Sequence, residues 1–486
     1  MNRELTRVSA LVLVMFLALF TSSSIIQSVQ AESLNADQRN SRTIIDSFVV
    51  ERGAILVDGQ PIAQSVPSND LYNWQREYTN GGLYAAVTGY NTLDQGNTGI
   101  EGAMNAELTG TSDSQFLSEI ERLLTGRDPQ GAAVSTTINA AAQQAAAEGI
   151  GDFTGAAVAL DPETGEILAM YSSPTFDPNQ MAVHDSQLVI DYYNQLEADP
   201  AAPLQNRAIG GDLYYPGSVF KMIVASAALK TGDYTLESEF DNPAELKLPQ
   251  SSSVVKNSTE GQCGPVTDDK VDLETSIVYS CNIPFAQLAA ELGEDTIAAE
   301  AQAYGFGQPL EIPMGVTPSS YPSDMSEANL MLTGFGQYDV RVTPMQMAMM
   351  SASIANDGTL MKPNLIDEIV TDNLTVVSDP QPEVFANPST PGIASTLRES
   401  MEAGVDHGYA DLAQIEGATV GGKTGTAENG TDNEPYNLWF TGYAEQDGKK
   451  VAVAVVVVPE ENISGQGSNE IASPIAKSIM EAVLNS

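Results

Sequence analysis

Three short polar motifs follow one another in the chain and together carry the groups needed for serine acyl transfer. They are SVFK at 218–221, SCN at 280–282 and KTGT at 423–426. No motif suffices alone, because 253–256 (SVVK) also fits the first pattern and 33–35 (SLN) the second. Context distinguishes the chosen copies. The first lies on an apolar helical run, the second between two helical patterns, and the third on a strand.

The first motif predicts a nucleophile and its base. Pro216-Gly217 precedes an apolar stretch, so Ser218 is expected at a helix N-terminus, with Lys221 one turn on along the same face. Burial lowers the pKa of a lysine, and a neutral amine can take the serine proton. Free N–H groups at the helix start can face an oxyanion. The alternative is a surface lysine one turn from a capping serine.

The second motif places a hydroxyl and an amide two residues apart, at Ser280 and Asn282. On a turn between helices both side chains can face one cleft. The hydroxyl can then relay a proton, and the amide can hold a substrate backbone group. The alternative is a helix cap, the usual role of Ser and Asn at such places.

The third motif predicts a binding edge on the strand Ala418–Thr426. Lys423, Thr424 and Thr426 offer a cation and two hydroxyls, and Gly425 leaves room for another backbone. Such an edge can bind an extended peptide as an added strand and neutralise its carboxylate. The alternative is a strand end with a solvated lysine.

Composition limits the possible partners. The 486 residues allow two or more domains, and the net charge of −43 argues against nucleic acid and anionic lipid headgroups. With only His184 and His407 and no Cys-x-x-Cys, we expect no metal site, and we expect no cofactor. Cys263 and Cys281 are expected to pair if exported, or else to be two small buried thiols.

The N-terminus predicts a membrane segment. Arg3 and Arg7 precede an uncharged, largely apolar run from Val8 to Ala31, which is long enough to span a bilayer. The basic flank places the tip in the cytoplasm and the rest outside. A cleaved signal peptide is the alternative, because 29–31 (VQA) resembles a cleavage site.

Periodicity predicts two folded modules behind a polar linker at 32–42. Strand, turn and strand are expected over 43–57, an irregular, mostly β module over 58–130, and a mainly helical middle from 218 to about 336. Further strands are expected at 134–138, 155–159, 166–170, 418–426, 438–444 and 451–458, and helices at 139–149, closed by Gly149, and at 471–484.

With these motifs the chain resembles a class B penicillin-binding protein, a membrane-anchored peptidoglycan D,D-transpeptidase. Further matching segments are 52–55 (RGAI), 99–101 (GIE), 161–170 (DPETGEILAM), 206–208 (NRA), 334–344 and 439–443 (WFTGY). The segment 82–102 and the Ser-Cys-Asn form of the second motif are most similar to the actinobacterial penicillin-binding protein A branch.

The resemblance implies a penicilloyl-serine transferase fold of the α/β (α+β) class, with an antiparallel central sheet flanked by helices. The implied domains are 1–31 (cytoplasmic tip and signal-anchor), 32–132 (a non-catalytic dimerisation or pedestal domain, mostly β) and 133–486 (the transpeptidase domain). Ser218 is implied as the acylated nucleophile, Lys221 as its base and Ser280 as the proton shuttle. Substrate binding is implied for Asn282, Lys423, Thr424, Gly425 and Thr426.

The implied ligands are D-Ala-D-Ala stem peptides and inhibitory β-lactams, and the implied partners are a membrane glycosyltransferase or division or elongation proteins. No glycosyltransferase activity is expected. A D,D-carboxypeptidase would use the same site. A β-lactamase is disfavoured because Glu327 does not lie in the usual deacylation pattern, and a sensor with an idle site is disfavoured by three intact motifs. The acceptor residue, the oligomeric state and the choice between septum, side wall and spore stay open.

Overall fold

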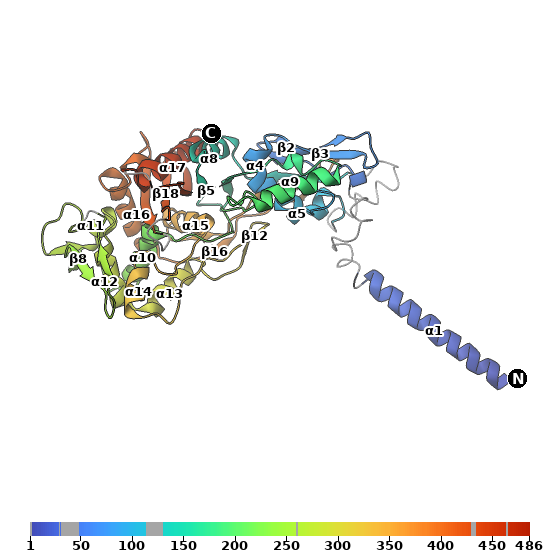
Figure 1. Cartoon of the computed structure of the whole chain (residues 1–486), viewed down its shortest axis with the longest axis horizontal. Helices are drawn as coiled ribbons and strands as arrows, with labels where there is room; N and C mark the ends of the chain where they lie inside the picture. Colours follow the sequence, from blue (N-terminus) through green and yellow to red (C-terminus); the bar gives the residue numbers. More distant parts are fainter. Residues whose placement is uncertain are drawn as a thin grey trace.

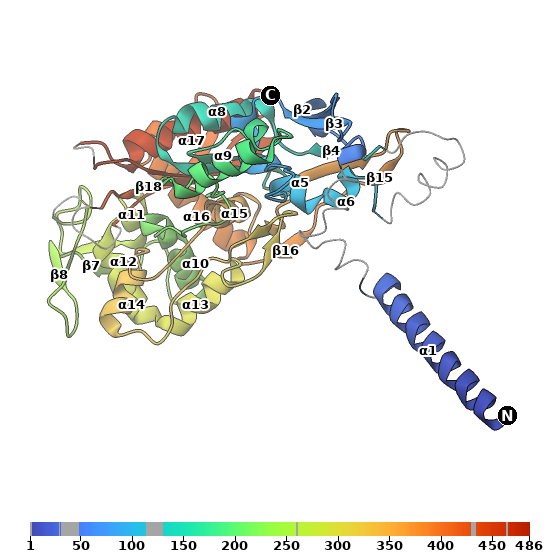
Figure 2. The same cartoon turned by 45° about the vertical axis from the view of Figure 1, so that its right-hand side comes forward.

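The computed structural model describes residues 2–28, 30, 48–112, 130–258, 261–428, 434–462 and 465–486. Helix α1 (Asn2–Ser28) contains an apolar stretch, Leu5–Ile26, that is long enough to cross a membrane and is not buried by the rest of the chain. Figures 1 and 2 show α1 apart from the folded body. The predicted linker at 32–42 and the motif copy at 33–35 lie outside the described residues.

A five-stranded antiparallel sheet forms the centre of the larger domain. Its order is β17 (Thr419–Ala427), β18 (Asn437–Gln446), β19 (Lys449–Val458), β5 (Thr154–Leu160) and β6 (Ile167–Ser173). The predicted antiparallel sheet is therefore confirmed, with the strands expected at 155–159, 166–170, 418–426, 438–444 and 451–458. β17 is an edge strand, so one side of its backbone has no strand partner in this sheet.

Successive side chains of β19 point to opposite faces of the sheet and are apolar on both, which explains why helices cover both faces. One set of side chains packs with α8 (Ala140–Ile150) and α17 (Ser468–Leu484), and the other packs with α15 (Pro344–Ala355). The first set is Val451, Val453, Val455 and Val457, and the second is Ala452, Ala454 and Val456. Both views place α8 and α17 on the side opposite the helical lobe (Figures 1 and 2).

The helical lobe carries the first two motifs. It contains α10 (Lys221–Thr231), α11 (Leu273–Val278), α12 (Asn282–Leu292), α13 (Glu294–Ala303) and α14 (Glu327–Thr333). The mainly helical prediction is confirmed, with short antiparallel pairs added. These are β7 (Glu239–Asp241) with β10 (Lys270–Asp272), β8 (Glu245–Lys247) with β9 (Val254–Lys256), and β11 (Leu310–Glu311) with β12 (Gly315–Val316). The motif copy at 253–256 therefore lies on a hairpin strand and not on a helix.

The smaller module is built on a six-stranded sheet that borrows strands from far along the chain. Its order is β15 (Val376–Ser378), β14 (Ile366–Val370), β4 (Ala133–Thr136), β1 (Ile55–Val57), β2 (Gln60–Pro67) and β3 (Trp74–Tyr78). β1 and β4 pair in parallel, so strands on both sides of residue 132 share this sheet. The domain boundary at 132/133 stays a prediction.

The expectation of a mostly β segment over 58–130 is wrong in part. β2 and β3 are followed by α4 (Gly81–Thr88), α5 (Gly99–Ala103) and α6 (Asn105–Leu108). Two of these helices have at most five residues, too short to give a helical period in the sequence. The first half of the strand–turn–strand expected over 43–57 falls largely outside the described residues, and its second strand is β1.

One helix boundary is also corrected. α8 begins after Asn139, whose side chain accepts a hydrogen bond from the Ala142 N–H and so caps the helix. The helix continues through Gly149, which packs against Ile475, and ends at Gly151 with φ 53°. The absence of a side chain at Gly149 lets α8 pack closely against α17, and the helix ends two residues later, at Gly151.

A buried charge cluster ties the smaller module together. Arg52 donates from Nε to Glu101 Oε2 (2.5 Å), and Arg76 donates from Nε to Glu101 Oε1 (2.6 Å). Tyr78 donates to the same carboxylate (3.2 Å). All four side chains are buried. Although burial opposes ionisation, the two arginines hold the pKa of Glu101 below its usual value.

Candidate active site

The nucleophile candidate lies on a tight turn where the helical lobe meets the sheet edge. Ser218 belongs to a 3-10 turn (Gly217–Phe220), and α10 begins only at Lys221. The predicted α-helical N-terminus is therefore corrected by one turn. Gly217 has φ 55°, and a Cβ there would approach Thr426 O to 2.7 Å. The turn is thus pressed against the third motif, and Ser218 stays partly exposed beside it.

Lys221 is completely buried. Its Nζ donates to Ser280 O (2.7 Å) and Asn282 Oδ1 (2.8 Å), with Ser280 Oγ at 3.5 Å. Among the described residues it forms no ion pair with a carboxylate. Burial, with the nearby charge of Lys423, places the pKa of Lys221 well below its usual value. The amine is therefore poised to be neutral.

Ser280 lies between the two lysines. It follows α11 with φ 56°, a left-handed conformation that turns the chain before α12 starts at Asn282. Its hydroxyl accepts a hydrogen bond from Lys423 Nζ (2.6 Å). The predicted turn between two helices is present, and Ser280 does not act as the cap of α12.

Asn282 is held by groups that the sequence did not single out. Its backbone N–H donates to Asn257 Oδ1 (2.9 Å), and its Nδ2 donates to Lys256 O (2.9 Å). Its own Oδ1 accepts from Lys221 Nζ. Nδ2 carries two N–H groups and gives one to Lys256 O, so the other is left for a ligand. Asn257 lies just past β9, and no motif marks it.

Cys263 and Cys281 are joined by a disulfide, with their Cα atoms 5.4 Å apart. Cys281 sits between Ser280 and Asn282 and is the N-cap residue of α12. The covalent link therefore fixes the wall from which both polar side chains reach the lysines.

The third motif runs along the sheet edge. Lys423 is 3% exposed, and burial lowers its pKa to about 7. The Thr424 hydroxyl donates to Tyr409 O (3.1 Å), whereas the side chain of Thr426 is exposed. A Cβ at Gly425 would approach Pro216 O to 2.9 Å, so glycine lets the nucleophile turn approach the strand.

Ser468 at the start of α17 is a site neighbour that sequence reasoning missed. Its hydroxyl donates to Gly425 O (2.6 Å) and lies 2.7 Å from Thr426 Oγ1. Gly467 N donates to Glu470 three residues on, which is the sequence signal of a helix start. That signal could have located the residue but not its contact with β17.

Thus the residues of the three motifs lie close together. A substrate carbonyl placed beside Ser218 would be near the buried amine of Lys221 and the open edge of β17. The predicted assignment of each role remains a proposal.

Known proteins are similar to this chain in sequence. Residues 155–481 match the family model described as the penicillin binding protein transpeptidase domain, and residues 52–134 match the penicillin binding protein A dimerisation domain. The chain is 36% identical to the peptidoglycan D,D-transpeptidase PbpA of Mycolicibacterium smegmatis, with 100% of this chain and 99% of that protein covered. Against PbpA of Mycobacterium tuberculosis the identity is 35%, with the same coverage.

Solved structures agree. The ceftriaxone acyl-enzyme complex of penicillin-binding protein A from M. tuberculosis is similar with a TM-score of 0.87 and 34% identity, covering 90% of this chain and 100% of that one. The corresponding penicillin G acyl-enzyme complex gives 0.84 and 35%, with the same coverage.

Proposed function

The chain belongs to the penicillin-binding protein transpeptidases, and from this premise we propose the role of each site residue. The protein is a peptidoglycan D,D-transpeptidase that β-lactams acylate. The observation that carries the residue assignment is the buried amine of Lys221, held at 2.7 and 2.8 Å by two neutral oxygens. A neutral amine that donates both N–H groups in this way keeps its lone pair for the Ser218 proton.

In the first half-reaction, Ser218 Oγ bonds to the carbonyl carbon of the penultimate D-alanine of a stem peptide. Lys221 Nζ receives the hydroxyl proton, and the backbone N–H of Ser218 stabilises the oxyanion. The amide bond to the last D-alanine then breaks. Ser280, in contact with both lysines, passes a proton to the leaving amine, so D-alanine departs and Lys221 is neutral again.

In the second half-reaction, an amine of another stem peptide attacks the ester carbon. Its proton returns through the same groups to Ser218 Oγ, which leaves as the hydroxyl, and a new amide joins the two peptides. The donor peptide adds to the open edge of β17, with Asn282 donating to its backbone. Its terminal carboxylate pairs with Lys423 and accepts from the hydroxyls of Thr424 and Thr426, which turn to it from Tyr409 O and Ser468 Oγ. Gly425 leaves space for the peptide.

We infer that α1 anchors the enzyme in the cytoplasmic membrane with Arg3 and Arg7 inside and the catalytic domain outside. An exported position agrees with the Cys263–Cys281 disulfide. Because the matched domains are a transpeptidase and a dimerisation module, we assign glycan polymerisation to a separate membrane glycosyltransferase. The partners of the smaller module are then division or elongation proteins.

Mass spectrometry tests the nucleophile assignment. The full-length protein in detergent is treated with benzylpenicillin, digested and mapped. We expect one adduct, on the peptide that contains Ser218, and none in Ser218→Ala. An adduct on Ser253 or Ser280 in the wild-type protein would refute the assignment while leaving penicillin binding itself intact.

A further inference from the structure

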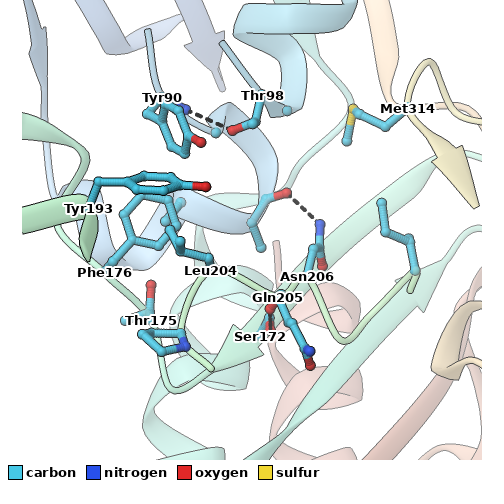
Figure 3. Close-up of a pocket in the computed structure, with 16 residues that line it drawn as sticks. Tyr90, Thr98, Ser172, Thr175, Phe176, Tyr193, Leu204, Gln205, Asn206 and Met314 are labelled. Carbon is cyan, nitrogen blue, oxygen red and sulfur yellow. Dashed lines mark hydrogen bonds between the residues drawn. The ribbon is translucent and has the colours of Figure 1, made fainter. Parts of the chain in front are cut away.

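A second cavity lies away from the motifs, where the smaller module meets the transpeptidase domain. It has a volume of about 380 Å³, within the range of small-molecule sites. One wall comes from the module, around Tyr90 and Thr98. The other comes from Phe176, Tyr193 and the loop that contains Asn206. Figure 3 shows the rings of Tyr90, Phe176 and Tyr193 gathered on one side and Met314 on the other.

Both walls are held in place. Asn206 Nδ2 donates to Ala86 O (2.8 Å), and Thr175 Oγ1 donates to Gly82 O (2.8 Å), so hydrogen bonds cross the junction. On the module side, Gly89 and Gly99 have positive φ and approach so closely that a Cβ on Gly89 would lie 2.2 Å from Thr98 O. The loop that presents Tyr90 therefore has little freedom, and the cavity is preformed.

Tyr90 leaves an unused polar group in this cavity. Its side chain is only 7% exposed, yet its hydroxyl makes no hydrogen bond to any residue that the structure describes. Burial, followed by the neighbouring Tyr193, raises the pKa of Tyr90 to about 12, so the hydroxyl stays neutral and can both donate and accept. Tyr90 lines the cavity, so its hydroxyl is open to a partner there, which a ligand or water supplies.

The chemistry of the walls limits the ligand. None of the described residues that line the cavity is charged, and the protein carries a net charge of −43, which disfavours an anionic peptide or a phosphate. A purely apolar ligand would leave the Tyr90 hydroxyl unpaired. A sugar ring meets both conditions, because its C–H face packs on aromatic rings and its hydroxyls pair with polar tips.

We propose that this cavity binds a neutral N-acetylated hexose unit of a glycan strand. The acetamido methyl packs against Met314, opposite the aromatic rings, and a sugar hydroxyl pairs with Tyr90. That the sugar is N-acetylated and belongs to peptidoglycan rests on the proposed function. The site would hold a strand at the module junction while Ser218 works on a stem peptide.

Titration of tri-N-acetylchitotriose into the full-length protein in detergent micelles, followed by saturation-transfer NMR, tests the proposal. We expect saturable binding. Tyr193→Ala should weaken it at least about tenfold by removing a wall, and Tyr90→Phe about threefold to tenfold by removing one hydrogen bond. Tyr192→Phe is the matched control on the same helix, α9 (Ser186–Ala198), because Tyr192 accepts from Asp177 N and does not line the cavity. It should bind as the wild type does.

No saturable binding to the wild-type protein, or wild-type affinity in both Tyr193→Ala and Tyr90→Phe, would overturn the proposal. Cellotriose, which lacks the acetamido groups, should bind more weakly, and equal binding would refute the N-acetyl assignment. Acylation by benzylpenicillin is measured in every variant and reports folding. If Tyr193→Ala fails this check, the Tyr90→Phe result decides. Absence of acylation in the wild-type protein, with sugar binding intact, would count against the proposed active site and leave the cavity proposal standing.

Discussion

Two buried pairs of cations, one in each part of the molecule, meet opposite surroundings. In the smaller module, Arg52 and Arg76 share the carboxylate of Glu101 at 2.5 and 2.6 Å. In the active site, Lys221 and Lys423 are equally buried, but their partners are hydroxyl, carbonyl and amide oxygens. One cluster neutralises its charge with a carboxylate. The other has no carboxylate among the described residues.

The residue types match these surroundings. An arginine stays protonated in a protein, so a buried guanidinium needs an anion, and Glu101 supplies it. A lysine can lose its proton when buried, and the lowered pKa values of Lys221 and Lys423 follow from that desolvation. The carboxylate therefore marks a structural cluster, and its absence marks a reactive one.

The largest expected effect is loss of acylation in Lys221→Ala, because a missing general base costs about 10²-fold to 10⁴-fold in rate. Lys221→Arg sharpens the comparison, since a guanidinium would keep the charge but could not accept the serine proton, and we expect it to be equally inactive. The measurement is the second-order rate of acylation by a fluorescent penicillin. Lys477→Ala, on α17 with an exposed i,i+4 partner, is the control. Normal acylation in Lys221→Arg would disprove the base assignment.

The next effect is on stability. Glu101→Gln leaves two buried guanidiniums without an anion, so we expect the free energy of unfolding to fall by about 3–5 kcal/mol. Glu163→Gln, which breaks the exposed pair with Lys450, should cost less than about 1 kcal/mol. Urea unfolding of the full-length protein measures both. The folded Glu101→Gln variant should acylate at the normal rate. A stability loss no larger than that of Glu163→Gln would contradict the structural reading of the cluster.

Much of this contrast could be predicted from the sequence. A serine and a lysine three residues apart ahead of an apolar run indicated the reactive pair, and the Val-rich run 451–458 indicated the central strand. Local spacing encodes both features. The resemblance identified Arg52 and Glu101 as module residues. Their ion pair spans 49 positions, however, so no local pattern could show it.

What the sequence missed depends on contacts between distant segments. Ser468 reaches Gly425 across 43 residues, and Asn257 supports Asn282 from a hairpin 25 residues away. β14 joins the module sheet from more than two hundred residues downstream of its neighbour β4. Composition and periodicity carry no information about such pairings, since they arise from tertiary packing.

Removal of the disulfide tests whether this covalent link holds the geometry of the active site, which has no ion pair among the described residues. In the chain-entropy model, a link between residues separated by 18 positions contributes about 3 kcal/mol, so the double variant Cys263→Ser, Cys281→Ser should unfold that much more easily. Acylation should slow as well, because Ser280 and Asn282 flank Cys281. Non-reducing peptide mapping of the exported protein first establishes the link. Two free thiols there, or a double variant of unchanged stability and rate, would show that no disulfide braces the active site.

The smallest effect concerns the proton of Lys423, whose pKa burial lowers to about 7. A charge-assisted bond to a substrate carboxylate is worth about 1.5–3 kcal/mol, so Lys423→Ala should acylate about 10-fold to 100-fold more slowly below pH 7. In the wild-type protein the cation is present below pH 7 and is lost as the pH rises through that value. Its acylation rate should therefore decline towards that of Lys423→Ala between pH 7 and 9.

Lys423→Arg separates charge from titration, because arginine keeps its proton over this range. We expect the acylation rate of Lys423→Arg to stay constant between pH 7 and 9, where that of the wild type declines. An identical decline in both proteins would assign the titration to another group. Stability provides a second check. The unfolded lysine keeps its proton up to about pH 10.5, so between pH 7 and 10.5 the unfolded state binds more protons and the free energy of unfolding rises with pH. That rise should shrink in Lys423→Ala, whereas Glu101→Gln, which leaves Lys423 and its burial unchanged, should retain it.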